Sequence, residues 1–123
     1  MPKQIIVQNA NRKIDSPAKI KYCDTFSRQL RGFTFRSRLS PTEGLLLVGT
    51  RDSRLDSSIH MLFVSFDLTV IWINSNMQVV DKVLAKSWRP AYFSNKPAQY
   101  VLEIHPERWG EFEIGDTVAF QDV

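Results

Sequence analysis

The chain has 123 residues, of which 43% are hydrophobic and 24% are charged, a composition that excludes a disordered chain and fits one domain. The formal net charge is +3, with 11 Lys/Arg against 5 Asp/Glu in residues 1–62 and 5 against 8 in residues 63–123. Such asymmetry is compatible with a surface for an anionic ligand or nucleic acid, and equally with a solvated face that folding mixes with the acidic half.

Cysteine content and hydropathy set the expected compartment. One cysteine, Cys23, can form neither an internal disulfide nor a cysteine-rich zinc site. The first apolar run, residues 5–7, is too short for a signal peptide or a membrane span, and no other stretch reaches spanning length without a charge. We therefore expect a single domain over residues 1–123, located in the cytoplasm and without contact to a membrane.

The first half of the chain mixes strand and helix signals. Alternating apolar residues predict strands at residues 3–8 and 18–23. Residues 24–31 predict a short helix that is capped at its start by Asp24 or Thr25 and ended by Gly32. A short buried strand is predicted at residues 45–48, followed by a polar loop at residues 50–57.

The second half reads as strands and turns. The strongest strand candidates are residues 58–64 and 68–74, and the second lacks alternation, so we expect it to be covered on both faces. In the next strand, Val79 and Val83 are expected to share a face with Asp81. The remaining predictions are a turn at 74–76, a strand at 78–84, a loop at 86–97, a strand at 98–105, one helical turn at 106–109, a turn at 115–116 and a strand at 117–120.

These elements predict a mostly β fold, a compact single-domain β-barrel or sandwich-like structure with one or two short helices. The core is expected to centre on four consecutive apolar residues and three partners from other strands: Val70, Ile71, Trp72 and Ile73, with Leu46, Val101 and Val118.

The common catalytic fingerprints are absent: no dinucleotide-binding glycine motif, P-loop, zinc-protease motif or nucleophile elbow occurs. The only histidines are His60 and His105, which excludes a histidine-rich metal site but leaves open one of two histidines plus carboxylates. We expect no metal and no cofactor.

Four features could carry a function, and each has a structural alternative. Arg36 follows Phe33 and Phe35, so its guanidinium could lie beside a pocket or form an ion pair. His60 lies in an apolar run, typical of a hydrogen-bonded core histidine. The loop residues Trp88 and Arg89 could bind a ligand, or the indole could cover the core. Glu103 lies between two apolar residues, which favours solvent exposure, with an ion pair to an arginine as the next alternative.

Several of these residues carry a resemblance to the uncharacterised domain of unknown function 192 family, also called UPF0127-type. Over residues 18–120 the chain resembles the family in ordered motifs: Gly32-Phe33-Thr34-Phe35-Arg36 with Leu39, Gly44-Leu45-Leu46-Leu47, Ile59-His60, Trp88-Arg89, Val101-Leu102-Glu103 and Gly115-Asp116. The resemblance implies a β-rich fold and no established activity. The family's acid after its Pro-Ile pair is replaced by Thr69, and Asp67, two positions earlier, is the nearest acid that could substitute.

Three functions fit these observations. The first is a non-catalytic module that binds a small anionic or polar ligand, with Arg36, His60 and Arg89 converging on one concave site. The second is an enzyme with His60 as general acid/base, oriented by Asp67 or Glu103. The third is a nucleic-acid surface built from the arginines of residues 28–54, disfavoured because interleaved exposed aromatics are not evident. The sequence carries no signal of oligomeric state.

Overall fold

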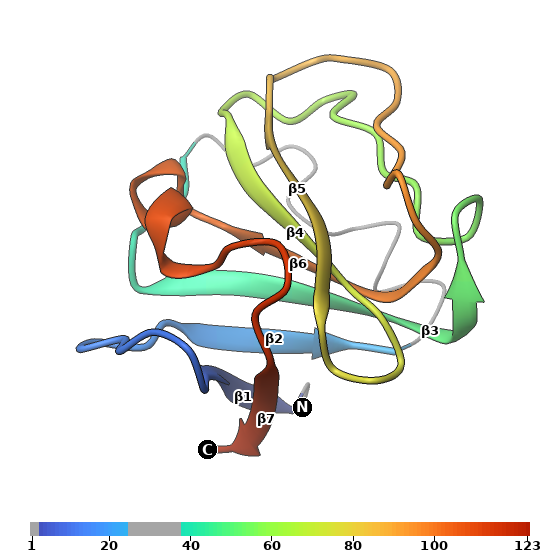
Figure 1. Cartoon of the computed structure of the whole chain (residues 1–123). Coiled ribbons are helices and arrows are strands. Elements are labelled where there is room, and N and C mark those ends of the chain that lie inside the picture. The colour runs from blue at the N-terminus through green and yellow to red at the C-terminus, as the bar shows by residue number, and fades with distance from the viewer. Residues whose placement is uncertain (1–2, 25–37) are drawn as a thin grey trace.

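Seven strands form one curled sheet, a half-barrel that confirms the predicted mostly β fold (Figure 1). The computed structural model describes residues 3–24 and 38–123. Most of the helix predicted at residues 24–31, and the segment that contains Arg36, lie outside these described residues. Across the sheet the strand order is β5-β4-β6-β3-β2-β1-β7.

The strands match most of the predicted ones within one or two residues. All neighbouring pairs are antiparallel except β2 and β3, which run parallel. The elements are β1 (Gln4–Asn9), β2 (Lys19–Cys23), β3 (Glu43–Ser53), β4 (Leu68–Ile73), β5 (Val79–Ala85), β6 (Ala98–Ile104), the 3₁₀ helix η1 (Pro106–Glu111) and β7 (Val118–Asp122).

Two predictions around the middle of the chain are wrong. The strand β3 continues to Ser53 through an irregularity after Val48, so the polar stretch predicted as a loop begins as strand. Residues 58–64 are not a strand, because the chain turns where Val64 N donates to Met61 O and Phe63 adopts a φ of 62°. A turn of this kind ends the ladder after one isolated bridge between Ile59 and Tyr92.

The strand β4 lies at the centre of the fold, and every one of its residues is buried. Alternate side chains enter two separate apolar clusters, because the sheet is covered on both faces. One face contributes Val70 and Trp72 to the cluster that includes Val101. The other face contributes Ile71 and Ile73 to the cluster that includes Leu46 and Val118. All seven predicted core residues are therefore buried, but they belong to two layers.

The predicted side-chain pattern of β5 is wrong, because a β-bulge interrupts this strand. Trp72 pairs with Asp81, whereas the next residue, Ile73, pairs with Val79, so one extra residue is inserted between the two pairs. An inserted residue reverses the alternation. Val79 consequently packs in the cluster of Ile73, and Val83 packs against the cluster of Trp72. The two valines do not share a face.

The start of β5 also contacts the segment that leads into β7, which brings the two ends of the sheet together. Val79 N donates to Asp116 O, Gly115 N donates to Val79 O, and Val118 N donates to Met77 O, each at 2.8–2.9 Å. Val79 and Val118 belong to the second apolar cluster, and Met77 packs against it. Figure 1 shows the red segment before β7 running beside β5.

Candidate functional site

Two loops at the end of the half-barrel away from the chain termini pair with each other through their backbones (Figure 1). We call residues 55–67 and 86–95 the apposed loops. Ile59 and Tyr92 exchange two hydrogen bonds, Met61 N donates to Arg89 O at 2.8 Å, and Trp88 N donates to Met61 O at 2.9 Å. Tyr92 Oη also accepts from Lys86 N at 2.7 Å. These bonds fix the two loops relative to each other.

The apposed loops are tied to the core as well. Trp72, buried in β4, donates its indole N–H to Ser57 O at 2.8 Å. Arg54 Nε, just before the first loop, donates to Ser94 O in the second at 2.9 Å. A surface built on anchored loops holds its side chains in place before a ligand arrives, which lowers the ordering cost of binding.

An exposed aromatic pair lies on this surface. The rings of Phe63 and Trp88 meet edge to face with centroids 5.1 Å apart, and the two residues are 48% and 53% exposed. Both residues have positive φ angles, 62° and 66°, a region that bulky residues rarely adopt. Such strain persists where the surroundings enforce it, and it clusters at functional sites.

Other large apolar side chains on the apposed loops are exposed as well. Of the large hydrophobic side chains that are exposed in the described part of the chain, five belong to the apposed loops: Leu55, Leu62, Phe63, Trp88 and Phe93. The sequence offered no reason to expect them at the surface, because runs such as residues 61–64 read as a buried strand.

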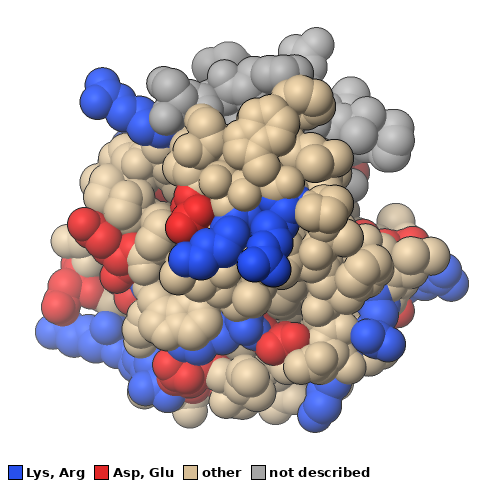
Figure 2. Space-filling view, turned by 90° about the horizontal axis from the view of Figure 1, so that it is seen from above, with Lys and Arg blue, Asp and Glu red and all other residues tan. Residues whose placement is uncertain are grey.

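The sequence-predicted polar residues on these loops divide into two groups. Asp67 is committed to the loop structure, since its carboxylate accepts from Ser87 N at 2.9 Å and lies 3.4 Å from Lys86 Nζ. His60 and Arg89 are exposed, and neither side chain forms a hydrogen bond or ion pair with another described residue. His60 is therefore not the hydrogen-bonded core histidine that its apolar neighbours suggested. Figure 2 shows basic and acidic side chains adjoining on the face that these loops cover.

Glu103 lies in β6, and the predicted solvent exposure is wrong. Its side chain shares a face with Val101 and is flanked across the strands by Leu45 and Val70. It is only 6% exposed, and burial raises the pKa of its carboxyl from 4.5 to about 7. No hydrogen bond joins it to His60 within the described residues, so the proposed acid/base pair of His60 and Glu103 lacks geometric support.

The family acid replaced by Thr69 would not reach the apposed loops from this position. Thr69 is fully buried in β4 and its hydroxyl donates to Pro106 O in η1 at 3.4 Å. Asp67, by contrast, precedes β4 and contacts Lys86 and Ser87, which follow β5. Asp67 therefore does not take over the contacts of position 69.

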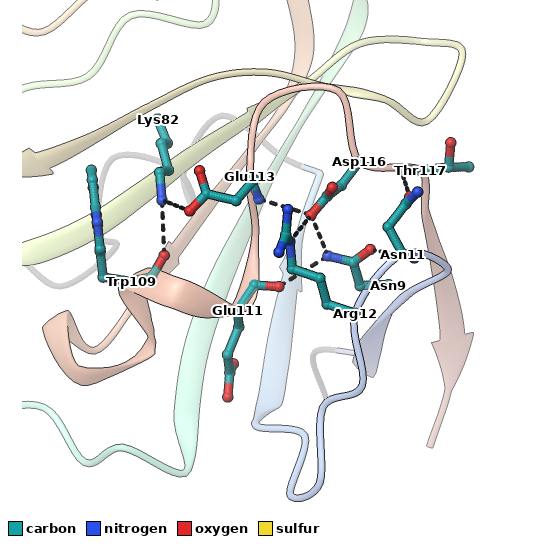
Figure 3. Close-up of polar contacts among 9 residues, drawn as sticks. All are labelled: Asn9, Asn11, Arg12, Lys82, Trp109, Glu111, Glu113, Asp116 and Thr117. Atoms are coloured by element: carbon teal, nitrogen blue, oxygen red, sulfur yellow. Dashed lines mark hydrogen bonds and ion pairs between the residues drawn. The ribbon is translucent and has the colours of Figure 1, made fainter.

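Sequence reasoning missed a hydrogen-bond network that joins the loop after β1 to the turn before β7 (Figure 3). One oxygen of Asp116 accepts from Asn9 Nδ2, Arg12 Nε and Glu113 N, each at 2.7–2.8 Å. Desolvation raises the pKa of Asp116, but these hydrogen bonds and the Arg12 charge lower the pKa by more than desolvation raises it. The net shift of the pKa is therefore downward. The Gly115-Asp116 motif is therefore structural: Gly115 supplies a φ of 96°, and Asp116 fastens the turn.

Two cationic side chains that are mostly buried form hydrogen bonds and ion pairs around η1. Arg108 donates from Nε to Pro41 O at 2.6 Å and from Nη2 to Ser16 O at 2.7 Å, and its Nη1 donates to both carboxylate oxygens of Glu111 at 2.9 Å. Lys82 lies 2.7 Å from Glu113 and 3.9 Å from the ring centre of Trp109, with its side chain only 8% exposed (Figure 3). No sequence pattern marked either residue.

A groove of about 390 Å³ runs between β1, the loop after it and the start of β7. Arg12 and Lys13 lie along it, but Arg12 is already bound to Asp116. Among residues 3–24 and 38–123 no three His, Cys, Asp or Glu side chains gather as metal ligands would. No helix in the described part of the chain is long and apolar enough to cross a membrane.

Solved structures share this fold. A protein of Sinorhizobium meliloti 1021, described as a candidate transcription regulator, is 18% identical, with a TM-score of 0.81 over 98% of this chain and 94% of its own. A protein of unknown function from Novosphingobium aromaticivorans is 20% identical, with a TM-score of 0.78 over 94% of this chain and 83% of its own. At these identities the likeness defines the fold class alone.

The chain belongs to the DUF192 family, described as Uncharacterized ACR, whose sequence model matches residues 6–120. UPF0127 proteins of Thermococcus kodakarensis and Thermococcus gammatolerans are 36% and 37% identical over 83% and 82% of this chain. The chain spans 64% and 65% of the length of these two relatives. The family motif around Gly44 has a packing basis here, because a Cβ at this position would lie 2.6 Å from Ile20 Cδ1 and 2.9 Å from Glu103 O.

Proposed function

We propose that the protein is a non-catalytic module that binds a small ligand with an anionic group at the apposed loops. The observation that carries the proposal is Arg89: an exposed guanidinium on an anchored loop, beside an exposed aromatic pair, with no acceptor among the described residues. A guanidinium grips a carboxylate or phosphate with two parallel hydrogen bonds.

His60 is the second group in this proposal. It adjoins Met61, whose amide donates to the carbonyl of Arg89, so the two exposed side chains start from neighbouring backbone positions. An imidazole can donate a hydrogen bond to an anion in either tautomer. Arg36 stays a predicted contributor on the strength of the sequence alone. The proposal includes a cytoplasmic location, since a single buried thiol, Cys23, outside any disulfide suits a reducing compartment.

A thermal-shift screen of inorganic phosphate and simple carboxylates tests the proposal. A ligand at about 100 times its Kd stabilises the folded state by about 2.7 kcal/mol, which raises the melting temperature by several degrees. We expect at least one anion to do so, and Arg89→Ala to abolish the shift. Arg51→Ala, which removes an exposed guanidinium paired with Asp56, is the matched control and should respond like the parent. An anion response that Arg89→Ala leaves intact would refute the site.

A further inference from the structure

Two side chains on the apposed loops, Arg89 and His60, have hydrogen-bond donors to offer a ligand. Both are exposed, and neither forms a hydrogen bond or ion pair with another described residue. The other cations of the two loops and of the segment just before the first are engaged: Lys86 lies 3.4 Å from Asp67, Arg51 lies 3.6 Å from Asp56, and Arg54 donates to Ser94 O. These pairs also take up both acids of the apposed loops, so the charge of Arg89 is left without a counterion from the described part of the loops.

The backbone brings Arg89 and His60, one from each loop, to neighbouring positions. Met61 N donates to Arg89 O at 2.8 Å, and Ile59 exchanges two hydrogen bonds with Tyr92. His60 therefore lies between two residues that are each bonded to the second loop. Ile59 and Met61 are buried, whereas His60 between them is open to solvent, as Arg89 is. One small ligand can thus use donors from both loops.

The geometry of the two donors restricts the shape of the anion. A guanidinium binds two oxygens of one acid group through parallel N–H bonds that lie in its own plane. A carboxylate or a phosphodiester has only two free oxygens, so the arginine occupies both. A phosphomonoester has a third free oxygen, which its tetrahedral phosphorus directs out of the line of the other two. An imidazole from the opposite loop, which donates in either tautomer, supplies the hydrogen bond for that oxygen.

We propose that the ligand of the apposed loops is a small phosphomonoester, with two phosphate oxygens bound by Arg89 and the third by His60. The inference rests on the proposed function and names the ligand class of the same site. A phosphomonoester carries a charge of about −1.5 to −2 at pH 7, more than a carboxylate or a diester carries. A guanidinium without a counterion favours the more highly charged group.

Four probes separate the number of oxygens from the charge. Methyl phosphate has three free oxygens and is largely a dianion, methyl sulfate has three and a single charge, and dimethyl phosphate and acetate each have two and a single charge. Binding is measured by isothermal titration and by the imidazole signals of the two histidines. His105 is the internal reference, because its Nδ1 already accepts from Glu107 N at 3.1 Å. We expect methyl phosphate to bind most tightly, and methyl sulfate to bind about fivefold more tightly than dimethyl phosphate.

Variants then assign each contact. His60→Ala should remove the preference for methyl sulfate over dimethyl phosphate and leave the affinity for dimethyl phosphate unchanged, whereas Arg89→Ala should weaken binding of all four probes. Arg51→Ala, which removes an exposed guanidinium paired with Asp56, is the matched control and should bind each probe like the parent. Near-ultraviolet circular dichroism of each variant checks that the fold is retained.

The outcomes distinguish this inference from the proposed function. Equal affinity for methyl sulfate and dimethyl phosphate, both dependent on Arg89, would overturn the phosphomonoester assignment and leave the anion site intact. A preference for methyl sulfate that persists in His60→Ala would overturn the assignment as well. Failure of every anion to bind would refute both proposals.

One further comparison tests whether the phosphate group belongs to a small molecule. Phosphoserine capped at both ends is compared with the same residue at the centre of an uncharged pentapeptide. A small-molecule ligand predicts that the peptide binds no more tightly than the single residue. A peptide that binds more tightly would overturn the assignment to a small ligand, because residues on either side of the phosphate would then be recognised too.

Discussion

At the scale of single residues, backbone strain and burial mark the positions whose side chains need an explanation. Trp88 and Phe63 adopt left-handed φ angles although each residue is about half exposed, so neither is held there by complete burial. Glu103 is the reverse case, a carboxyl enclosed by apolar neighbours. Each leads to a measurable expectation.

Replacing Trp88 by glycine should change the free energy of unfolding by less than about 1 kcal/mol. Relief of left-handed strain, about 1–2 kcal/mol, offsets the lost contacts of a half-exposed ring. Urea denaturation measures the change. Trp109→Gly, which removes a ring stacked on Lys82 and relieves no strain, is the control and should cost more. A loss above about 2 kcal/mol at Trp88 would show that its ring is required for folding.

Glu103→Gln should remove a pH dependence of stability. The folded-state pKa of about 7 lies above the ordinary 4.5, so the unfolded chain ionises first as the pH rises. The parent should therefore lose stability between pH 4.5 and 7, by about 3 kcal/mol in total, and lose no more from this group above pH 7. The variant should be more stable than the parent at pH 8.

Chemical denaturation at pH 5 and at pH 8 gives the comparison directly. Glu107→Gln, at an exposed position on η1, is the control and should follow the parent at both pH values. If Glu103→Gln were less stable than the parent at pH 8, the ionised carboxyl would be contributing favourable interactions in the folded state, and our account of its burial would fail.

Glu103 also shows why a residue's surroundings were hard to predict from its neighbours. Alternation placed its side chain opposite Leu102 and Ile104, and that part is correct. The inference from the opposite face to solvent assumes a sheet with one wet face. Here both faces of β6 are covered, as they are for β4, where the lack of alternation did predict it.

At the scale of elements, β4 is the strand on which both core layers depend. Ile71→Ala should cost about 2–5 kcal/mol, because Ile71 is fully buried among the residues of one layer and a cavity would remain. Equilibrium denaturation measures this cost. Ile114→Ala, at an exposed position, is the control and should cost far less. A cost below about 1 kcal/mol at Ile71 would contradict the central place of β4.

Asp116 fastens the loop after β1 to the turn before β7. Asp116→Ala should destabilise the protein by about 1–3 kcal/mol, since it leaves the part-buried donors of Asn9 and Glu113 and the Arg12 charge without their acceptor. Because the pKa of Asp116 is lowered, its contribution is present at neutral pH and is lost as the pH falls through that pKa. The variant should therefore be less sensitive to acid than the parent.

Thermal unfolding followed at pH 7 and at pH 3 tests both statements. Asp15→Ala is the control, because Asp15 pairs with Lys13 at the surface and should contribute little. Equal stability of Asp116→Ala and the parent at pH 7 would mean that the network in Figure 3 is not required for the fold.

Element boundaries were predictable where apolar runs and turn residues agreed, as at β4 and the Asn74–Gln78 turn, in which Asn74 Oδ1 accepts from Asn76 N and Gln78 N. They were not predictable where the backbone departs from a regular ladder. The bulge in β5 depends on pairing with β4, and the turn at Phe63 is fixed by Met61 and the second apposed loop. Neither long-range contact is visible in a local pattern.

At the scale of the whole molecule, the arrangement of strands sets where the fold is most resistant to opening. β4 and β6 lie inside the sheet and pair with a strand on both sides, whereas β7 pairs with β1 along its length and has only the bond from Val118 N to Met77 O on the β5 side. Hydrogen–deuterium exchange should be slowest in β4 and β6 and fastest in the apposed loops, except at hydrogen-bonded amides such as the four that join the two loops through their backbones, those of Ile59, Met61, Trp88 and Tyr92. Slower exchange in β7 than in β4 would contradict this order.

The antiparallel pairing of β1 with β7 has a consequence for engineering. Lys3 Nζ lies 3.2 Å from Asp122, and Val123 N donates to Gln4 O at 3.2 Å, so the two ends of the described chain lie side by side. A linker of a few small residues would join them without distorting either strand, and new ends could be opened at the exposed residues Ser75 and Asn76. In such a circular permutant the new chain ends would lie in the turn between β4 and β5. The same sheet would then be built from strands in a different sequence order.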